Sequence, residues 1–299
     1  MLTTLVPDNT WALIATRIAR SLGQRFSPGR PTPVMGGCTS AAWRLADGDL
    51  AVFIKTGMAE QRALFEAEAD GLDALAAGAA VRYPRVIAVG DAEAHSFLAL
   101  EWLTIRGRGD WALLGRQLAA QHRNVSSSHG WHRDNNIGNT PQRNRRDSVW
   151  WRFFADNRLH CQLELAARRG ADQHLIDCGN RLLERLPTLL GAHTPDPALL
   201  HGDLWPGNVG FCSDGQPVLF DPAVHHGDRE CDLAMAALFG GFPDTFHHAY
   251  HAAWPLPPGW EQRRPLYQLY HVLNHGNLFG GSDDSQAIRI IKHLLNREA

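Results

Sequence analysis

Residues 200–222 constrain the fold and the chemistry of this chain more than any other segment. Asp203 is followed five residues later by Asn208, and Asp221 comes thirteen residues after that asparagine. Residues 209–220 consist of two short apolar runs around the turn sequence Ser-Asp-Gly-Gln, which predicts a β-hairpin. A hairpin returns the chain close to its starting point, so Asn208 and Asp221 should lie side by side, near Asp203.

These three side chains suit phosphoryl transfer. The pattern His-x-Asp203-x-x-x-x-Asn208 has the spacing of a kinase catalytic loop. Asp203 is expected to accept the proton of a substrate hydroxyl, while Asn208 and Asp221 are expected to bind the Mg²⁺ that holds the ATP phosphates. The alternative is that these are loop carboxylates that cap a hairpin, but it does not account for the complete spacing.

Lys55 is the expected contact to the ATP phosphates. It ends an apolar run at 50–54 that predicts a strand, and residues 60–77 after it have the pattern of an amphipathic helix. A strand lysine that holds phosphates pairs with a glutamate of the next helix. Glu68 faces inward with the apolar residues of that helix, whereas Glu66 points to the opposite side. We therefore predict a Lys55–Glu68 pair.

Two further segments complete the expected nucleotide site. Gly36 and Gly37 lie between two predicted strands ahead of Lys55, where a loop that covers phosphates would be. The adenine is expected against the backbone from Glu101 to Leu103, directly after another predicted strand.

The order of elements predicts an α+β, bilobal protein-kinase-like fold. Strands are expected at 34–45, with a glycine turn inside, and at 50–54, 86–89 and 97–100. Further helices are expected at 113–122, 150–169 and 174–190. Residues 1–103 would then form a small β-rich nucleotide-binding lobe. Residues 104–299 would form a larger helical lobe with the catalytic loop and the substrate cleft.

Composition excludes several other classes of protein. The chain has 29 Lys and Arg against 31 Asp and Glu, a formal charge of −2, so neither nucleic acid nor an anionic membrane is an expected partner. No apolar run reaches the roughly 18 residues of a membrane span, and no targeting peptide is expected at the start. Five scattered cysteines favour reduced thiols and a cytoplasmic location.

Beyond the kinase spacing, the sequence resembles the fructosamine kinase (ketosamine-3-kinase) family, relatives of aminoglycoside phosphotransferases. The resemblance runs from about residue 34 to 281 and is most specific in residues 220–235, which read FDPAVHHGDRECDLAM. One departure is the pair His225 and His226, where the family more often carries two aromatic residues. That departure concerns the rim of the substrate site and leaves the preferred sugar open.

The resemblance implies an ATP- and Mg²⁺-dependent kinase that phosphorylates the sugar 3-hydroxyl of ketosamines, namely fructosamine, ribulosamine or erythrulosamine adducts. The phosphorylated adduct is labile, so the sugar leaves and the amine is repaired. The ketosamine could be a small molecule or protein-bound, and the enzyme is expected to be a monomer, with a dimer as the alternative. The competing functions are a kinase for another amino sugar or an aminoglycoside, and a non-catalytic nucleotide-binding module. The module would lack the lysine, the base or a metal ligand, and all are present.

Four residues are candidates for substrate contacts. The resemblance places Trp205 and His275 at the substrate cleft, where they would hold the sugar. The alternatives are a core aromatic residue and a buried, hydrogen-bonded histidine. Asp228 and Glu230 would suit a cationic amine.

Two residues have other expected roles. Asp232 is predicted to be structural, because it precedes the apolar residues 233–238, where it could cap a helix and hold the catalytic-loop backbone. Cys38 directly follows the two glycines of the predicted phosphate loop. Backbone N–H groups there would stabilise a thiolate, so we predict a redox-sensitive cysteine, with a plain loop residue as the alternative.

Overall fold

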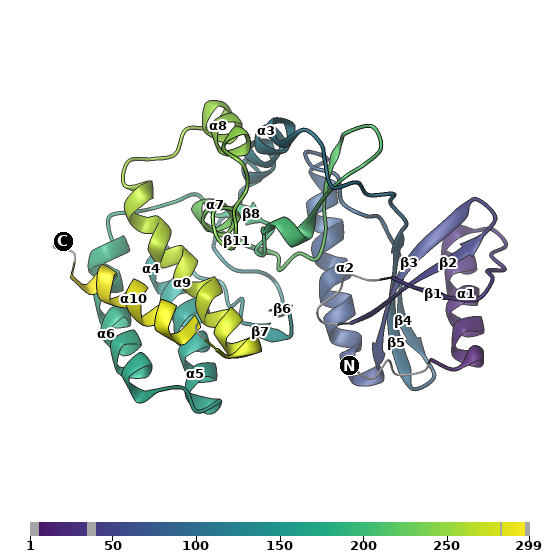
Figure 1. The fold of residues 1–299 in the computed structure, drawn as a ribbon, viewed down its shortest axis with the longest axis horizontal. Coiled ribbons are helices and arrows are strands. Elements are labelled where there is room, and N and C mark those ends of the chain that lie inside the picture. The colour runs from purple at the N-terminus through teal and green to yellow at the C-terminus, as the bar shows by residue number, and fades with distance from the viewer. Residues whose placement is uncertain (1–5, 35–39, 282, 297–299) are drawn as a thin grey trace. The chain divides into compact units, whose positions relative to one another are not determined.

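The computed structural model describes residues 6–34, 40–281 and 283–296 (Figure 1). The chain divides into two compact units. The first contains residues 1–109 and 210–220, and the second contains residues 110–209 and 221–299. The assignment of nucleotide binding to one lobe and substrate binding to the other stays a prediction.

The first unit is built on an antiparallel five-stranded sheet with the strand order β1-β2-β3-β5-β4. The strands are β1 (Thr32–Pro33), β2 (Ala41–Asp47), β3 (Leu50–Met58), β4 (Val86–Ala92) and β5 (His95–Glu101). The helices are α1 (Asp8–Leu22) and α2 (Arg62–Ala77), the latter preceded by the 3₁₀ turn η1 (Ala59–Gln61). The predicted strands at 50–54, 86–89 and 97–100 are confirmed, with longer bounds.

Alternation along β3 decides which helix packs on which face of the sheet. Ile54 is buried in an apolar cluster together with Ile14 and Ile18 of α1. Its neighbour Lys55 points to the opposite face, because successive strand residues alternate, and there it meets Glu68 of α2. Figure 1 shows β4 and β5 between the two helices. The sheet therefore separates an apolar face from the face that carries the lysine.

Helices dominate the second unit. They are α3 (Trp111–His122), α4 (Trp150–Phe154), the π-helical turn η2 (Ala155–Leu159), α5 (His160–Arg168), α6 (Gln173–Leu190), α7 (Glu230–Ala236), α8 (Asp244–Ala253), α9 (Trp260–Phe279) and α10 (Asp283–Leu295). Their core gathers Phe154, Leu182, Leu273 and Ile291 from four different helices. The three predicted helices are confirmed, although η2 interrupts the one at 150–169. In the described part of the chain, none of the helices has the length and apolar character to cross a membrane.

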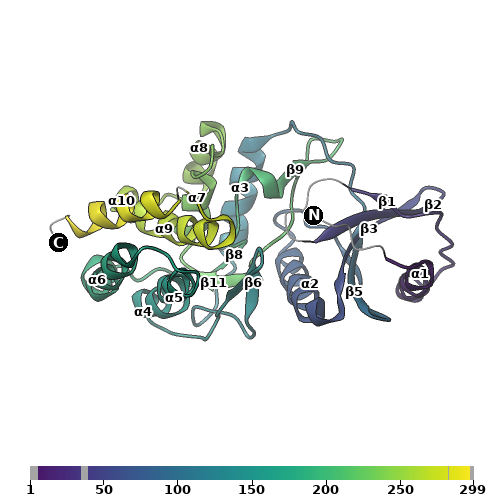
Figure 2. The same ribbon diagram turned by 60° about the horizontal axis from the view of Figure 1, so that its bottom comes forward.

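Three pairs of short strands complete the fold. They are β6 (Asn135–Ile137) with β7 (Thr140–Gln142), β8 (Ala198–Leu200) with β11 (His225–Gly227), and β9 (Val209–Phe211) with β10 (Pro217–Leu219). The β9–β10 pair is the predicted hairpin. The β8–β11 pair was not predicted; its two strands lie side by side (Figure 1, Figure 2). Its register aligns Leu200 with His225. This register brings the residues that follow β8 beside the residues that precede β11.

Candidate active site

Asp203, Asn208 and Asp221 lie together at one end of the β8–β11 pair. The chain leaves β8, passes through Asp203 and turns back at the 3₁₀ turn η3 (Pro206–Asn208). Nδ2 of Asn208 donates to the backbone oxygen of Asp203 at 2.9 Å and to its Oδ2 at 3.2 Å. The same nitrogen contacts the backbone oxygen of Asp221 at 3.4 Å. One amide group therefore joins the three residues.

The environment of Asp203 changes its proton affinity. Burial is the main cause that raises the pKa of Asp203 to about 7; the Asn208 hydrogen bond opposes the shift, and the charges of Asp221 and Asp232 add to it. A carboxylate with a pKa near neutrality is suited to accept a proton during a reaction. A cation bound nearby would stabilise the ionised form and lower this pKa again.

The backbone at the site is held in uncommon conformations. Asp221 has a φ of 55°, a left-handed conformation that is strained for a residue other than glycine. Gly202 has a φ of 83°, and a Cβ atom there would lie 2.0 Å from the carbonyl oxygen of Ala223. The Ala223 N–H donates to the oxygen of His201 at 2.8 Å. The loops that carry Asp203 and Asp221 are thus joined backbone to backbone.

Asp232 also holds the backbone of the loop that carries Asp203. Its carboxylate accepts hydrogen bonds from the backbone N–H groups of His201 and Gly202, both at 2.8 Å, and from Nε2 of His122 at 3.1 Å. Burial opposes its ionisation, but hydrogen bonds and charge from His122, with further help from His201 and Gly202, keep the pKa of Asp232 below its usual value. The expected cap was wrong in one respect, because α7 already begins at Glu230 and Asp232 lies inside its first turn.

The first unit contains the predicted lysine pair. Nζ of Lys55 lies 2.7 Å from Oε1 of Glu68, and both side chains are largely buried. Glu66 instead bonds to Nε of Arg62 at 2.7 Å on the exposed side of α2. Helical geometry therefore identified the correct glutamate.

The structure describes only some of the other residues that are expected at the nucleotide site. Glu101 ends β5, and its Oε1 accepts a hydrogen bond from Arg82 at 2.9 Å. Leu103, two residues later, is half-buried. Gly36, Gly37 and Cys38 lie outside the described residues.

The four described cysteines are all buried free thiols. They are Cys161, Cys178, Cys212 and Cys231. Burial raises the pKa of Cys161 and of Cys231 above the usual thiol value. These thiols are therefore poorly reactive in the folded protein.

Trp205 and His275 occupy different environments. Trp205 is half-buried and packs against the apolar core of the second unit. His275 lies on α9, where its Nδ1 contacts Oδ2 of Asp283 at 2.7 Å. Its side chain is 43 % exposed, so the alternative of a buried histidine is wrong.

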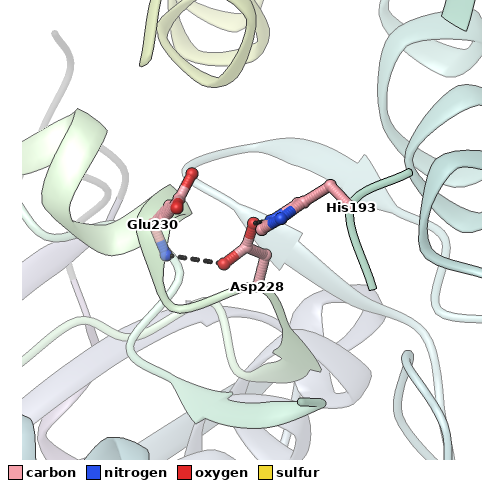
Figure 3. A group of neighbouring side chains, drawn as sticks. All are labelled: His193, Asp228 and Glu230. Carbon is pink, nitrogen blue, oxygen red and sulfur yellow. Dashed lines mark hydrogen bonds and ion pairs between the residues drawn. The ribbon is translucent and has the colours of Figure 1, made fainter. Parts of the chain in front are cut away.

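Asp228 and Glu230 do not meet the expectation that they face a substrate amine. Asp228 is 1 % exposed and accepts a hydrogen bond from Nε2 of His193 at 2.6 Å (Figure 3). The hydroxyl of Tyr267 donates to the same carboxylate at 2.7 Å. Glu230 is 0 % exposed, and Arg263 donates to its two carboxylate oxygens at 2.6 and 2.8 Å. Both carboxylates are already satisfied within the protein.

Asp228 and Glu230, together with His193, also have the spacing of a metal site. His193, Asp228 and Glu230 form the one such group in the described ranges, with ligand atoms within 4.8 Å of one another. A cation there would have to displace Arg263 from Glu230 and would lie beside its guanidinium charge. The arrangement therefore fits a buried charge network, which needs no ion.

The relationship to known proteins follows from sequence and fold together. The family model for fructosamine kinase matches residues 10–297. The chain belongs to the fructosamine kinase family. This fructosamine kinase homologue is 45 % identical to a probable ketoamine kinase from Synechocystis over 289 residues, which covers 95 % of this chain and 97 % of the relative. It is an ATP-dependent phosphotransferase.

Solved structures support this family assignment and also show the broader fold to which the chain belongs. A protein from Haemophilus somnus 129PT that is assigned as a fructosamine-3-kinase has a TM-score of 0.89 and 29 % identity, with 96 % of this chain and 98 % of that chain covered. A choline kinase from Streptococcus pneumoniae has a TM-score of 0.62 and 14 % identity, with 96 % and 99 % covered. The predicted protein-kinase-like α+β fold is thereby confirmed.

His122 also supports the loop that carries Asp203, although no sequence motif marks it. The residue is fully buried, and it connects Asp232 on one side to the hydroxyl of Tyr250, 2.9 Å from its Nδ1, on the other. A histidine at the end of an apolar helix was the available signal. Its partners lie 110 and 128 residues away, so the sequence did not reveal the contact.

Proposed function

We propose that this enzyme transfers the γ-phosphoryl group of ATP to the 3-hydroxyl of ketosamines, such as fructosamine, ribulosamine or erythrulosamine adducts. The observation that carries the proposal is the joined arrangement of Asp203, Asn208 and Asp221 in a member of this family. The phosphorylated adduct would release its sugar, so the reaction would serve deglycation.

Each residue at the site has a defined role in this proposal. Asp203 accepts the proton of the attacking hydroxyl, because it has the position of the base in the catalytic-loop spacing and is held beside Asn208 and Asp221. Asn208 and Asp221 fit Mg²⁺, because both offer hard oxygen ligands and the engaged Nδ2 of Asn208 leaves its amide oxygen for a cation. When bound, Mg²⁺ neutralises charge on the phosphates. Asp232 holds the loop backbone and thereby positions Asp203.

The ATP contacts in the first unit are those that the sequence predicts. Lys55 binds the phosphates and is oriented by Glu68. Gly36 and Gly37 cover the phosphates, and the backbone from Glu101 to Leu103 receives the adenine.

Release of ADP from ATP across a panel of acceptors tests the proposal. The panel contains fructosamine, ribulosamine, erythrulosamine and one aminoglycoside. Turnover with a ketosamine, and a phosphate on its 3-hydroxyl, is the expected result. Turnover with the aminoglycoside alone would overturn the proposed substrate class while leaving phosphotransfer intact.

Asp221→Ala is expected to weaken the binding of Mg·ATP by at least about 10-fold. Replacement of a group that only supports a metal ligand already costs about 10- to 100-fold in metal affinity, and Asp221 is proposed to be a ligand itself. Calorimetric titration with Mg·ATP measures the change. Asp214→Ala, an exposed aspartate in the β9–β10 turn, is the control. An unchanged affinity in Asp221→Ala would remove that residue from the metal site.

Trp205→Ala is expected to raise the KM for the ketosamine and leave the KM for ATP unchanged. Packing of an aromatic ring contributes about 0.5–1.5 kcal/mol, which corresponds to roughly a 2- to 12-fold change in KM. Trp260→Ala is the matched control, because Trp260 is also half-buried against the same core. Equal rises for both substrates would indicate a general structural defect.

A further inference from the structure

Two buried amide side chains of the β6–β7 hairpin contact the loop that follows Asp221. The register of the hairpin places Asn135 directly opposite Gln142, so both side chains leave the same face of the pair. Nδ2 of Asn135 donates to the backbone oxygen of Val224 at 2.8 Å. Nε2 of Gln142 donates to the backbone oxygen of Ala223 at 3.1 Å. One hairpin therefore holds two successive carbonyl groups of the loop.

Arg158 determines which atom of Asn135 faces the loop. Its buried guanidinium can only donate, and Nη2 lies 2.8 Å from Oδ1 of Asn144. Nδ2 of Asn144 therefore points away from Arg158, and it donates to Oδ1 of Asn135 at 2.8 Å. Because that oxygen is engaged, Asn135 turns its nitrogen to the Val224 carbonyl. The direction of these hydrogen bonds thus follows from the one group that cannot accept.

Gln142 is oriented from helix α9. The hydroxyl of Tyr270 donates to its Oε1 at 2.8 Å, and its Nε2 donates to Oδ1 of Asn135 at 2.8 Å as well as to the loop. Rotating the amide by 180° would put its oxygen against two other oxygens, so a single orientation satisfies all of the partners. Gln142 is 2 % exposed, which leaves little access for water to replace them.

The loop that these amides hold has a strained backbone. Asp221 has the left-handed φ of 55°, and such a conformation persists only where the surrounding structure determines it. Two residues later, the N–H of Ala223 donates to the oxygen of His201 at 2.8 Å, while the carbonyl of Ala223 accepts from Gln142. Residue 223 is thus fixed through both of its backbone polar groups, directly beside the strained position.

We propose that Gln142 and Asn135 are positioning residues for Asp221. They hold the backbone of residues 223 and 224 and thereby keep Asp221 in the strained conformation from which it would bind Mg²⁺. The inference rests on the proposed function, in which Asp221 is a metal ligand. The two amides act through the loop backbone and not as ligands themselves.

The preference for Mg·ATP over metal-free ATP tests the proposal. Calorimetry gives the dissociation constants of Mg·ATP and of ATP in EDTA for the wild type, Gln142→Met, Asp221→Ala and the double variant. Loss of a residue that supports a metal ligand costs about 10- to 100-fold in metal affinity. Nδ1 of His225 also contacts the Ala223 oxygen, at 3.2 Å, so we expect Gln142→Met to lose about 10-fold of the preference. In the Asp221→Ala background it should cause no further loss.

Two more variants separate positioning from general stability. Gln162→Met is the matched control, because Gln162 is equally buried but its Nε2 donates to Asn274 of α9, at 3.2 Å, and not to the loop. It should lower the melting temperature and keep the full preference for Mg·ATP. Tyr270→Phe leaves Gln142 in place and removes only the hydroxyl that orients it. This milder variant should lose a smaller part of the preference, and it provides the test if Gln142→Met does not fold.

The outcomes distinguish this inference from the proposed function. An unchanged preference in Gln142→Met and Tyr270→Phe, or an equal loss in Gln162→Met, would overturn the positioning role. A further loss when Gln142→Met is added to Asp221→Ala would also overturn it, because the glutamine would then act independently of that aspartate. An Asp221→Ala enzyme that keeps its preference for Mg·ATP would instead overturn the metal assignment of the proposed function.

Discussion

Asp203→Asn is expected to lower kcat for the ketosamine by roughly 10²- to 10⁴-fold, the range that a positioned general base contributes. The amide is nearly the same size as the carboxylate and can still accept the hydrogen bond that Nδ2 of Asn208 now donates to Oδ2. The loop should therefore keep its shape and Mg·ATP should still bind. The loss would fall on proton transfer, so kcat should drop while the dissociation constant of the nucleotide changes little.

Single-turnover kinetics and nucleotide calorimetry on the same preparation check this result. Asp214→Asn, in the exposed hairpin turn, serves as the control for a generic loss of one carboxylate. A near-normal kcat in Asp203→Asn would falsify its role as the base. Loss of nucleotide binding in parallel would mean that Asp203 mainly supports the metal ligands.

Asp232→Ala is expected to reduce the free energy of unfolding by about 3–5 kcal/mol, as removal of one partner from a buried charged pair does. The substitution leaves the N–H groups of His201 and Gly202 and the Nε2 of His122 buried without an acceptor. At about 2–4 °C per kcal/mol for a domain of this size, the melting temperature should fall on the order of 10 °C.

The pH dependence of that loss provides a second check. The folded-state pKa of Asp232 is depressed, so its contribution to stability is present above the unfolded value near 3.9 and is lost as pH falls through the lower folded value. The difference between wild type and Asp232→Ala should therefore shrink in acid. Asp196→Ala, an exposed aspartate of the same unit, is the control. A change below about 1 °C at neutral pH would contradict the structural role.

The spacing of residues along the chain was sufficient to predict that Asp203, Asn208 and Asp221 lie together. It also predicted that Lys55 pairs with Glu68. The hairpin between Asn208 and Asp221 required only a turn sequence between two apolar runs. The choice of Glu68 over Glu66 followed from the 3.6-residue period of a helix, since Lys55 approaches α2 from its buried side. Both inferences depend on local geometry, which a sequence encodes directly.

Which carboxylates are buried by segments that are distant along the chain was not predictable in this way. Asp228 and Glu230 read as free acids because their donors, His193, Tyr267 and Arg263, lie 33 to 39 residues away along the chain. The start of α7 was missed for a related reason. Polar residues usually mark the exposed beginning of a helix, but here they are enclosed by the core.

The buried cysteines make local stability measurable one element at a time. Cys161 lies on α5, Cys178 on α6, Cys231 on α7, and Cys212 directly after β9. Each can react with an alkylating reagent only when its own element opens, because reagent and thiolate must meet in water. The rate of alkylation at each position therefore reports the opening free energy of that element. The native sequence thus supplies four natural probes of where this enzyme opens first, without any introduced label.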